Sequence, residues 1–256
     1  MKIRNPVIFL ALLFLSGCAA TQYSVTPAPN SNTKKVYQEG IATCLSEKKN
    51  IVSIRPTASK IASKTRQSFV VAIHNRSNKD VVFSEQNITA VYSGSDGEEK
   101  TLKIYSYDEL VAEETKRQQW AAIAAGLSAI GNAASAATAG YSNTYGSYSG
   151  NTYSTSGNSY STYGNYSSNT YNAGAALAAQ NAANAQNDAM FAKLASSASA
   201  NMKHLASTTL KKSTVAPGQW FGGRVRIDIP KLDDEGSIEF KIKSGLENHS
   251  LSLKIV

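Results

Sequence analysis

Charge is missing from the middle of this chain of 256 residues. The sequence has 26 Lys and Arg and 18 Asp and Glu, yet none of them lies between Gln118 and Asn187, a stretch of seventy positions. Charged residues make up 17% of the chain, which is below the roughly 25% of an average soluble domain. The deficit is local, so we expect the middle region to differ in architecture from the two charged regions that flank it.

Residues and motifs that carry chemistry are also scarce. The two cysteines and three histidines show no CxxC or HExxH spacing, and the acidic residues show no EF-hand spacing. The sequence also has no GxSxG, Walker or GxGxxG motif. His74, His204 and His249 are scattered over separate predicted elements. We therefore predict a protein that is not an enzyme, with no catalytic residue, no cofactor and no metal site. A catalytic dyad assembled only in three dimensions stays open, because such sites depend on geometry rather than on motif.

The first 17 residues have the features of an export signal. Lys2 and Arg4 form a positive n-region, and the apolar run of about ten residues that follows is too short to span a bilayer. The run closes with Leu15-Ser16-Gly17-Cys18, which resembles the lipobox of bacterial lipoprotein signal peptides. The alternative is an ordinary signal peptide with an incidental cysteine.

The lipobox resemblance implies that residues 1–17 are cleaved off and that Cys18 is the lipidation site. Processing in that family attaches diacylglyceryl to the cysteine thiol and an acyl chain such as palmitate to the new amino terminus. Two or more chains hold a protein firmly in a membrane. Because Ala19 rather than aspartate follows the cysteine, the family's sorting rule points to the outer membrane. We expect a lipid-anchored envelope protein with no nucleic-acid partner, although its formal net charge is +8.

The segment after the lipidated cysteine, residues 18–50, is expected to be a flexible tether. It contains Pro27, Pro29 and many Ser, Thr and Asn residues, a composition typical of linkers. A helix around residues 34–49 is the alternative. Once Cys18 is acylated, Cys44 is the only thiol, and it is buried, free or paired between two chains.

Two segments far apart in the sequence, residues 51–107 and 206–256, are predicted to form β-strands. The first has short β-branched and aromatic runs between turn signals, and the second alternates apolar and polar residues, as at Val225, Ile227 and Ile229. Period-two alternation indicates antiparallel strands with one buried face. Because neither segment has enough strands for a closed core of its own, we expect both to form one β-sandwich.

Two parts of these segments resemble a known fold. Phe69 to Asn75 followed by Asp80 to Phe83, and Val215 to Gln219 followed by Gly222 to Ile229, are similar to strands and a Pro-Gly turn of telokin-like immunoglobulin-fold domains in bacterial lipoproteins. The resemblance implies an immunoglobulin-like sandwich that serves as a binding and assembly module. It transfers no catalytic residue, and the long middle insertion departs from the compact family pattern.

Five basic residues of the C-terminal strands are a weaker candidate surface. They are predicted to share the wet face of neighbouring strands, where they would suit anionic head groups or cell-wall polymers; they are Arg224, Arg226, Lys241, Lys243 and Lys254. Because Asp228 and Glu239 interrupt the set, an ordinary solvated face is the favoured interpretation.

Residues 108–205 are predicted to be an insertion of two alanine-rich helices. Heptad spacing connects Trp120, Ile123, Leu127, Ile130 and Ala134 in the first helix and Ala175, Ala178, Ala182, Ala185, Ala189 and Ala192 in the second. Two such seams predict an antiparallel hairpin with closely packed backbones. The stretch Trp120 to Gly140 is long enough to span a membrane, but its ten alanines and several polar residues disfavour insertion. Insertion as an oligomer, through small-residue packing, is the alternative.

Between the helices, residues 141–172 contain only Tyr, Ser, Gly, Asn and Thr. A segment without aliphatic side chains cannot offset the entropy of ordering, so we expect a disordered loop at the tip of the hairpin. Tyrosine among small polar residues is typical of adaptable contact surfaces and of self-associating low-complexity sequence. The candidate contact residues are Tyr141, Tyr145, Tyr148, Tyr153, Tyr160, Tyr163, Tyr166 and Tyr171. The alternative is a solvated loop without a role.

The sequence therefore predicts a fold that is mainly β with an α insertion. In this prediction, an immunoglobulin-like antiparallel β-sandwich is interrupted by an antiparallel Ala-rich helical hairpin with a disordered tip. The expected function is a non-enzymatic interaction or envelope-assembly module at the outer membrane, with an envelope protein, a glycan or a second copy as partner. The alternative function is a membrane-active or pore-forming component built from oligomerised hairpins.

Overall fold

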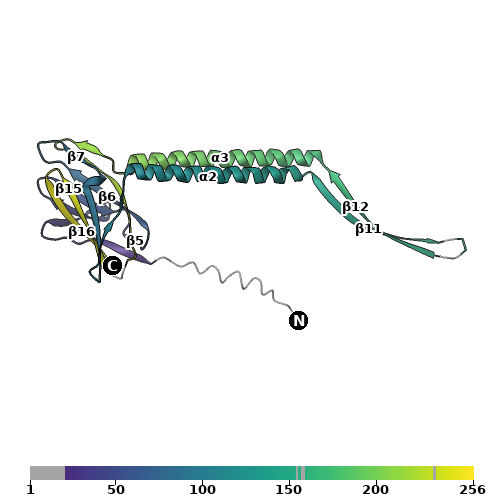
Figure 1. The fold of residues 1–256 in the computed structure, drawn as a ribbon, viewed down its shortest axis with the longest axis horizontal. Helices are drawn as coiled ribbons and strands as arrows, with labels where there is room; N and C mark the ends of the chain where they lie inside the picture. Colours follow the sequence, from purple (N-terminus) through teal and green to yellow (C-terminus); the bar gives the residue numbers. More distant parts are fainter. Residues whose placement is uncertain (1–20, 154, 157–158, 233–234) are drawn as a thin grey trace. The chain divides into compact units, whose positions relative to one another are not determined.

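The computed structural model describes residues 21–153, 155–156, 159–232 and 235–256. They form a mainly β protein with two long helices (Figure 1). The chain divides into two compact units, one made of the residues up to Leu110 together with Leu205–Val256, the other of Val111–His204. The predicted lipidation site Cys18 lies outside the described residues.

The first unit contains a six-stranded sheet in which the beginning and the end of the described chain are neighbours. Its order is β5 (Lys60–Ala62), β1 (Gln22–Pro27), β16 (Glu247–Ile255), β15 (Gly236–Ser244), β8 (Ile88–Gly94) and β9 (Glu99–Leu102). All neighbours are antiparallel, and Val25 of β1 lies opposite Ile255 of β16. Strands from both sides of the middle insertion therefore complete one sheet.

A second six-stranded antiparallel sheet also mixes early and late strands. Its order is β10 (Ile104–Tyr105), β14 (Trp220–Asp228), β6 (Arg66–His74), β4 (Ile51–Pro56), β3 (Ile41–Glu47) and β2 (Thr33–Gln38). A short pair, β7 (Val81–Phe83) with β13 (Ser213–Val215), and the 3-10 helix η2 (Glu85–Asn87) complete the unit.

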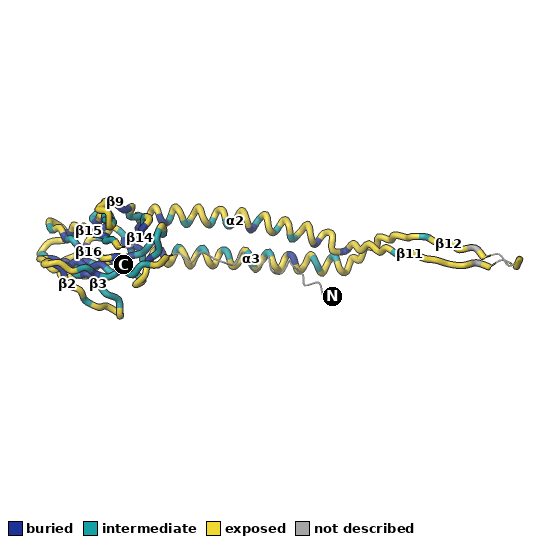
Figure 2. The backbone as a smooth tube through the Cα atoms, turned by 90° about the horizontal axis from the view of Figure 1, so that it is seen from below, coloured by how far each residue is buried: buried dark blue, intermediate teal, exposed yellow. Residues whose placement is uncertain are grey.

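The inward-facing side chains of the two sheets share one hydrophobic core. Phe69 on β6 and Phe240 on β15 are fully buried, and their ring centroids lie 5.2 Å apart. Val225 and Ile227 are buried, as the period-two alternation predicts. Burying each such side chain contributes about 1.5 to 3 kcal/mol. Figure 2 shows that buried residues concentrate in these sheets.

The predicted tether is wrong for residues 21–50, because they form β1, β2 and β3. The alternative of a helix at residues 34–49 is also wrong. Ser24 and Thr26 flank buried Val25 in β1, Thr43 and Ser46 are themselves buried in β3, and β-branched Thr fits a pleated strand well. Cys44 is fully buried with a free thiol. Its position in the core is incompatible with a disulfide to a second chain in this fold.

The second unit consists of α2 (Tyr107–Thr138), β11 (Tyr141–Tyr153), β12 (Ser159–Tyr171) and α3 (Ala173–Thr208), except that the first residues of α2 and the last residues of α3 belong to the first unit. The helices lie side by side in both backbone views (Figures 1 and 2). Gln118 Nε2 donates to the Ala198 carbonyl at 3.3 Å, and Asn132 Nδ2 donates to Asn187 Oδ1 at 2.8 Å. From the first bond to the second, the residue number rises on α2 and falls on α3, so the two helices run antiparallel.

The bulky seam predicted on α2 does not face α3. Trp120 and Leu127 are 71% and 66% exposed, whereas Ala125 and Ala136 are buried. The two sets are offset by two residues, about 200° around a helix. Heptad spacing identifies a stripe but not its partner, and the small residues are the ones that face α3. On α3, likewise, the predicted alanines are exposed and Ala183 is buried.

The disordered loop predicted for residues 141–172 is also wrong. β11 and β12 pair in one continuous antiparallel register, from Tyr141 opposite Tyr171 to Tyr153 opposite Ser159. Tyr and Thr favour extended backbone, and the ladder pairs the backbone donors and acceptors that point towards the other strand without an aliphatic core. What the segment lacks is a buried layer, not regular structure.

Candidate functional site

The register of β11 and β12 sorts the tyrosines onto two faces of the ribbon. Side chains alternate between faces along each strand, and directly opposite residues share a face. Each pair joins two odd or two even numbers, as in Tyr141 with Tyr171 and Gly146 with Tyr166. We call the odd-numbered side the open face; its tyrosines are Tyr141, Tyr145, Tyr153, Tyr163 and Tyr171. The even-numbered side is the glycine face.

On the glycine face, two tyrosine rings lie across the opposite strand. Gly146 is paired with Tyr166 and Gly164 with Tyr148. A Cβ atom at either glycine would collide with the ring of the paired tyrosine. Only glycine leaves room for a ring to lie this close to the backbone. The aromatic ring then covers the backbone at the position where the opposite strand has no side chain. These tyrosines support the hairpin itself.

On the open face, three tyrosines stand free of such support. Tyr145, Tyr153 and Tyr163 are 77%, 74% and 78% exposed. Tyr163 lies opposite Ser149, so the ribbon carries one of these rings at every fourth position, roughly 14 Å apart. At the base of the ribbon, the ring centroids of Tyr141 and Tyr171 lie 4.9 Å apart. The result is a regular row of aromatic rings on an uncharged surface.

The remaining predicted contact residue, Tyr160, lies in β12 opposite Thr152, and the structure describes only its backbone. Sequence reasoning treated the eight tyrosines as equivalent and missed Gly146 and Gly164 as their partners. The Tyr–Gly pairs depend on the register of the two strands, so composition alone could not reveal them. Counting cross-strand pairs outward from Tyr153 opposite Ser159 would have placed each of these glycines opposite a tyrosine.

The open face offers binding chemistry rather than acid–base chemistry. Its groups are planar amphipathic rings with phenolic hydroxyls, flanked by Ser, Thr and Asn hydroxyls and amides. Such rings stack on flat apolar or sugar surfaces, and their hydroxyls donate or accept hydrogen bonds. Both outer edges of the two-stranded ribbon carry ladder groups without a further strand among the described residues.

The five basic residues of the C-terminal strands do not share one face, so the less favoured of the two interpretations, a basic contact surface, is wrong. Arg224 and Arg226 belong to β14 in one sheet, whereas Lys241, Lys243 and Lys254 belong to β15 and β16 in the other. Outward side chains of two sheets that share a core point in opposite directions. In addition, Lys241 and Lys254 form ion pairs with Glu239 at 3.4 Å and Glu235 at 3.5 Å.

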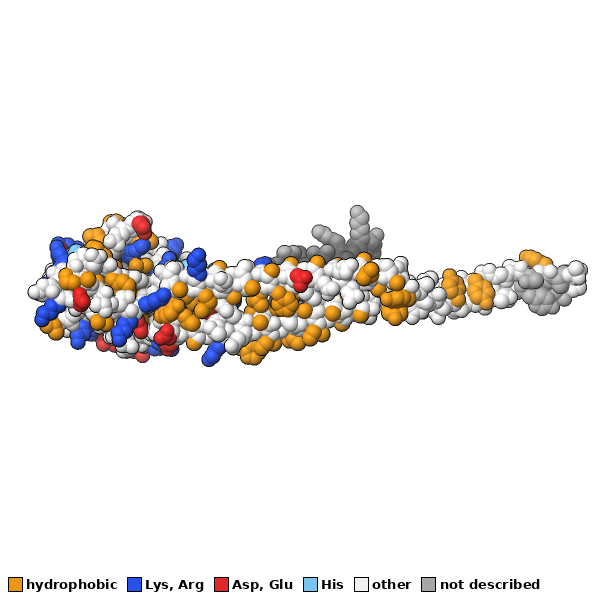
Figure 3. Space-filling model, turned by 90° about the horizontal axis from the view of Figure 1, so that it is seen from above, with side chains coloured by type: hydrophobic (Ala, Val, Ile, Leu, Met, Phe, Trp, Pro, Cys, Tyr) orange, Lys and Arg blue, Asp and Glu red, His pale blue; other side chains and the backbone are white. Residues whose placement is uncertain are grey.

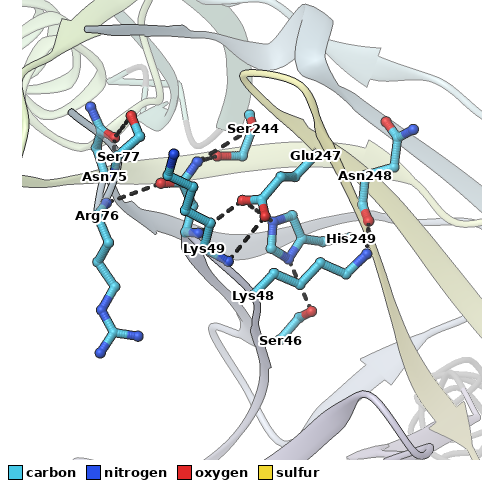
Figure 4. A network of polar contacts seen from close by, with 11 residues as sticks. Ser46, Lys48, Lys49, Asn75, Arg76, Ser77, Ser244, Glu247, Asn248 and His249 are labelled. Atoms are coloured by element: carbon cyan, nitrogen blue, oxygen red, sulfur yellow. Dashed lines mark hydrogen bonds and ion pairs between the residues drawn. The ribbon is translucent and has the colours of Figure 1, made fainter. Parts of the chain in front are cut away.

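A polar network in the first unit ties several turns together (Figure 4). The Glu247 carboxylate accepts hydrogen bonds from the backbone N–H groups of Lys49 at 3.0 Å and Asn50 at 2.8 Å. Buried Asn50 donates to Ser244 Oγ at 2.9 Å and accepts from the Arg76 N–H at 3.0 Å. These bonds join the β3–β4 turn, the β15–β16 turn and the segment after β6, which is a structural role.

His249 lies beside this network. Its side chain is fully buried, with Nδ1 at 2.9 Å from Ser46 Oγ and Nε2 at 3.9 Å from a Glu247 oxygen. Burial lowers the pKa of His249, and neighbouring Glu247 only partly opposes this effect. The imidazole is therefore neutral at pH 7. Among the residues that the structure describes, no three His, Cys, Asp or Glu side chains form a group suited to a metal ion.

We expect the stability of the sheets to fall as the pH drops below 6.5, the ordinary pKa of histidine. In that range the unfolded chain binds a proton at residue 249 and the folded chain does not, so the free energy of unfolding decreases by at most about 1.4 kcal/mol per pH unit. The decrease ends once the pH is below the depressed pKa of the folded state. Chemical denaturation at pH values between about 7.5 and 5, on both sides of the ordinary histidine pKa of about 6.5, measures this decrease in the free energy of unfolding. His249→Leu should flatten the slope; His204→Gln, on exposed α3, should not. An equal slope in H249L contradicts this account.

We expect Gly146→Val with Gly164→Val to open the hairpin, because each new side chain displaces a tyrosine ring. Gly150→Val is the matched control, since a Cβ at that position of β11 meets no atom within 4 Å and valine favours strands. Limited proteolysis within residues 141–171 and the near-ultraviolet tyrosine circular dichroism report on the hairpin. Equal resistance to proteolysis in both variants would show that the rings do not support the ribbon.

Comparison with known proteins gives no family and no structural neighbour for this chain. No family model matches it, and no curated protein and no solved structure is significantly similar to it.

Proposed function

We propose that this chain is an outer-membrane lipoprotein that acts, without catalysis, as an interaction or envelope-assembly module. The anchor is supported by the lipobox-like Leu15 to Cys18 and by Ala19 in the position that sorts such proteins. An acylated Cys18 would hold the protein in the membrane, and the folded units would face the aqueous side.

We propose further that the first unit is an immunoglobulin-like β-sandwich and the second a helical hairpin inserted into it. Two antiparallel sheets around one core support the sandwich. The two segments that carry the family resemblance are also bonded to each other. Buried Asn75 donates from Nδ2 to the Val215 carbonyl at 2.7 Å, and the Gly218 N–H donates to the Asn75 carbonyl at 2.6 Å. Gly218 has φ +77°, as the Pro-Gly turn requires.

The open face of the hairpin is the observation that carries the functional proposal. Tyr145, Tyr153 and Tyr163 expose about three quarters of their surface at regular spacing, and packing against the part of the chain that the structure describes does not account for them. Rigid amphipathic rings of this kind contribute large contact area at low entropic cost. Because the whole region is uncharged, we expect the interaction to depend little on salt.

A pore-forming or membrane-active role is the second candidate, and one observation favours it. Among the described residues, α2 is the single helix long and apolar enough to cross a membrane, and 11% of its most apolar window is buried. The alanine and polar content of that window weakens the case. Leakage of lipid vesicles caused by a Cys18→Ser chain would favour this role, and the contact role predicts no leakage.

The functional proposal is tested on the open face. Tyr145→Ser, Tyr153→Ser and Tyr163→Ser together should reduce binding of the full chain to isolated envelope fractions, including cell-wall polymer and outer-membrane protein, at least tenfold. That figure corresponds to a loss of about 1.4 kcal/mol. Co-sedimentation and pull-down at low and high salt measure the binding.

The matched control replaces the same three residues with phenylalanine, which keeps the rings and removes the hydroxyls. Retained binding in the phenylalanine variant would assign the contact to ring stacking, and loss in both would assign it to the hydroxyls. If the serine variant binds like the unmodified chain, the open face has no role in binding.

A further inference from the structure

We propose that a second copy of this chain docks on the outer side of α2, along the apolar stripe formed by Trp120, Ile123, Leu127 and Ile130. This inference does not depend on the tyrosine hairpin. The four side chains are 71%, 54%, 66% and 67% exposed, so no described residue covers them. Figure 3 shows hydrophobic side chains gathered along the helices, whereas charge concentrates on the sheets. A row of large exposed apolar side chains of this kind is typical of an interaction site.

The geometry of the stripe fits a helix as partner. Its residues and Ala134 recur at spacings of three and four, the repeat that packs one helix against another as knobs into holes. The stripe lies about 200° around α2 from Ala125 and Ala136, which are buried on the α3 side. One face of α2 is therefore satisfied within the chain, and the opposite face has the pattern of a helical interface without the partner.

Two glycines on the flanks of the stripe are a second, independent observation. Gly126 and Gly131 lie in the middle of α2, where glycine is less favourable than alanine. A Cβ added at either position meets no atom within 4 Å, so no packing against the described residues requires glycine there. The other flanking positions, Ala124 and Ala133, are also small. Small residues on both sides of a bulky stripe allow a second backbone to approach closely.

The stripe is complementary to itself when two copies run antiparallel. Its bulky end, Trp120 and Ile123, then lies opposite the alanine end of the other copy, with Trp120 near Ala137 and Ile123 near Ala134. Leu127 lies opposite Ile130 at the centre. Large residues facing small ones fill the interface, and the same patch serves both copies, as a two-fold axis requires. No charge between residues 118 and 187 opposes the contact.

A lipid surface fits the stripe less well than a second copy does. Helices that lie in the membrane interface have Lys and Arg on the polar face, and α2 has none beyond Arg117. The area offered, on the order of several hundred Å² per copy, is below the roughly 800 Å² per partner of a standard interface. We therefore expect a weak dimer with a dissociation constant in the micromolar range.

The test uses the full chain in cells, co-expressed with two different C-terminal tags and with a photo-crosslinking amino acid in place of Ala133. We expect a covalent product that contains both tags, joined to the second copy near Gly126. Attachment near position 133 of the second copy instead would overturn the antiparallel register. A product with another protein, without the doubly tagged one, would overturn the proposal.

Four variants separate the interface from general effects on folding. Ile123→Gln with Ile130→Gln should lower the yield of the doubly tagged product about tenfold, and so should Gly126→Gln with Gly131→Gln, although the glycine sites have room for a side chain. Leu177→Gln, which removes an equally exposed apolar residue of α3, and Thr115→Gln, at an exposed position of α2 before the stripe begins, should leave it unchanged. Helical circular dichroism confirms that each variant folds. Equal yields in all four overturn the proposal.

Discussion

The fold depends on strands from both sides of the insertion closing over one core. β1 pairs with β16, β6 with β14 and β8 with β15, so neither half of the chain has a complete sheet without the other. The insertion leaves and rejoins beside the same strand: Tyr105 pairs with Arg226 of β14, and the Leu210 N–H donates to the Arg224 carbonyl at 2.9 Å. A chain that departs and returns at neighbouring points on one strand must fold back on itself, which explains why α2 and α3 run antiparallel.

The second unit has little hydrophobic core, and small residues replace it. Ala125, Ala136 and Ala183 let the helices approach, while Tyr148 and Tyr166 cover glycines of the opposite strand. This leaves two regular sets of exposed rings and aliphatic side chains, one on the ribbon and one on the outer face of α2. Both sets lie in the part of the chain that has no charge, so the absence of charge is consistent with two contact surfaces rather than with a solvated spacer.

The sequence predicted well wherever local periodicity decides the structure. Alternation identified Val225 and Ile227 as core, and the alanine-rich composition identified the two helices. It failed where a long-range choice decides. Ser and Thr of residues 22–27 suit a linker or a strand, and pairing with β16 and β5 selects the strand. Heptad spacing showed one bulky stripe on α2 without showing whether α3 would pack against it. The open face exists only in the register of β11 with β12, which composition does not encode.

Hydrogen exchange of backbone amides in mild denaturant tests the shared core most directly. If the early and late strands form one cooperative unit, the slowest amides of β1, β4 and β6 open with the same free energy as those of β14, β15 and β16, and the values fall together as denaturant is added. Amides of β11 and β12 should exchange faster. Two separate opening energies, one for strands before the insertion and another for strands after it, would contradict a single core.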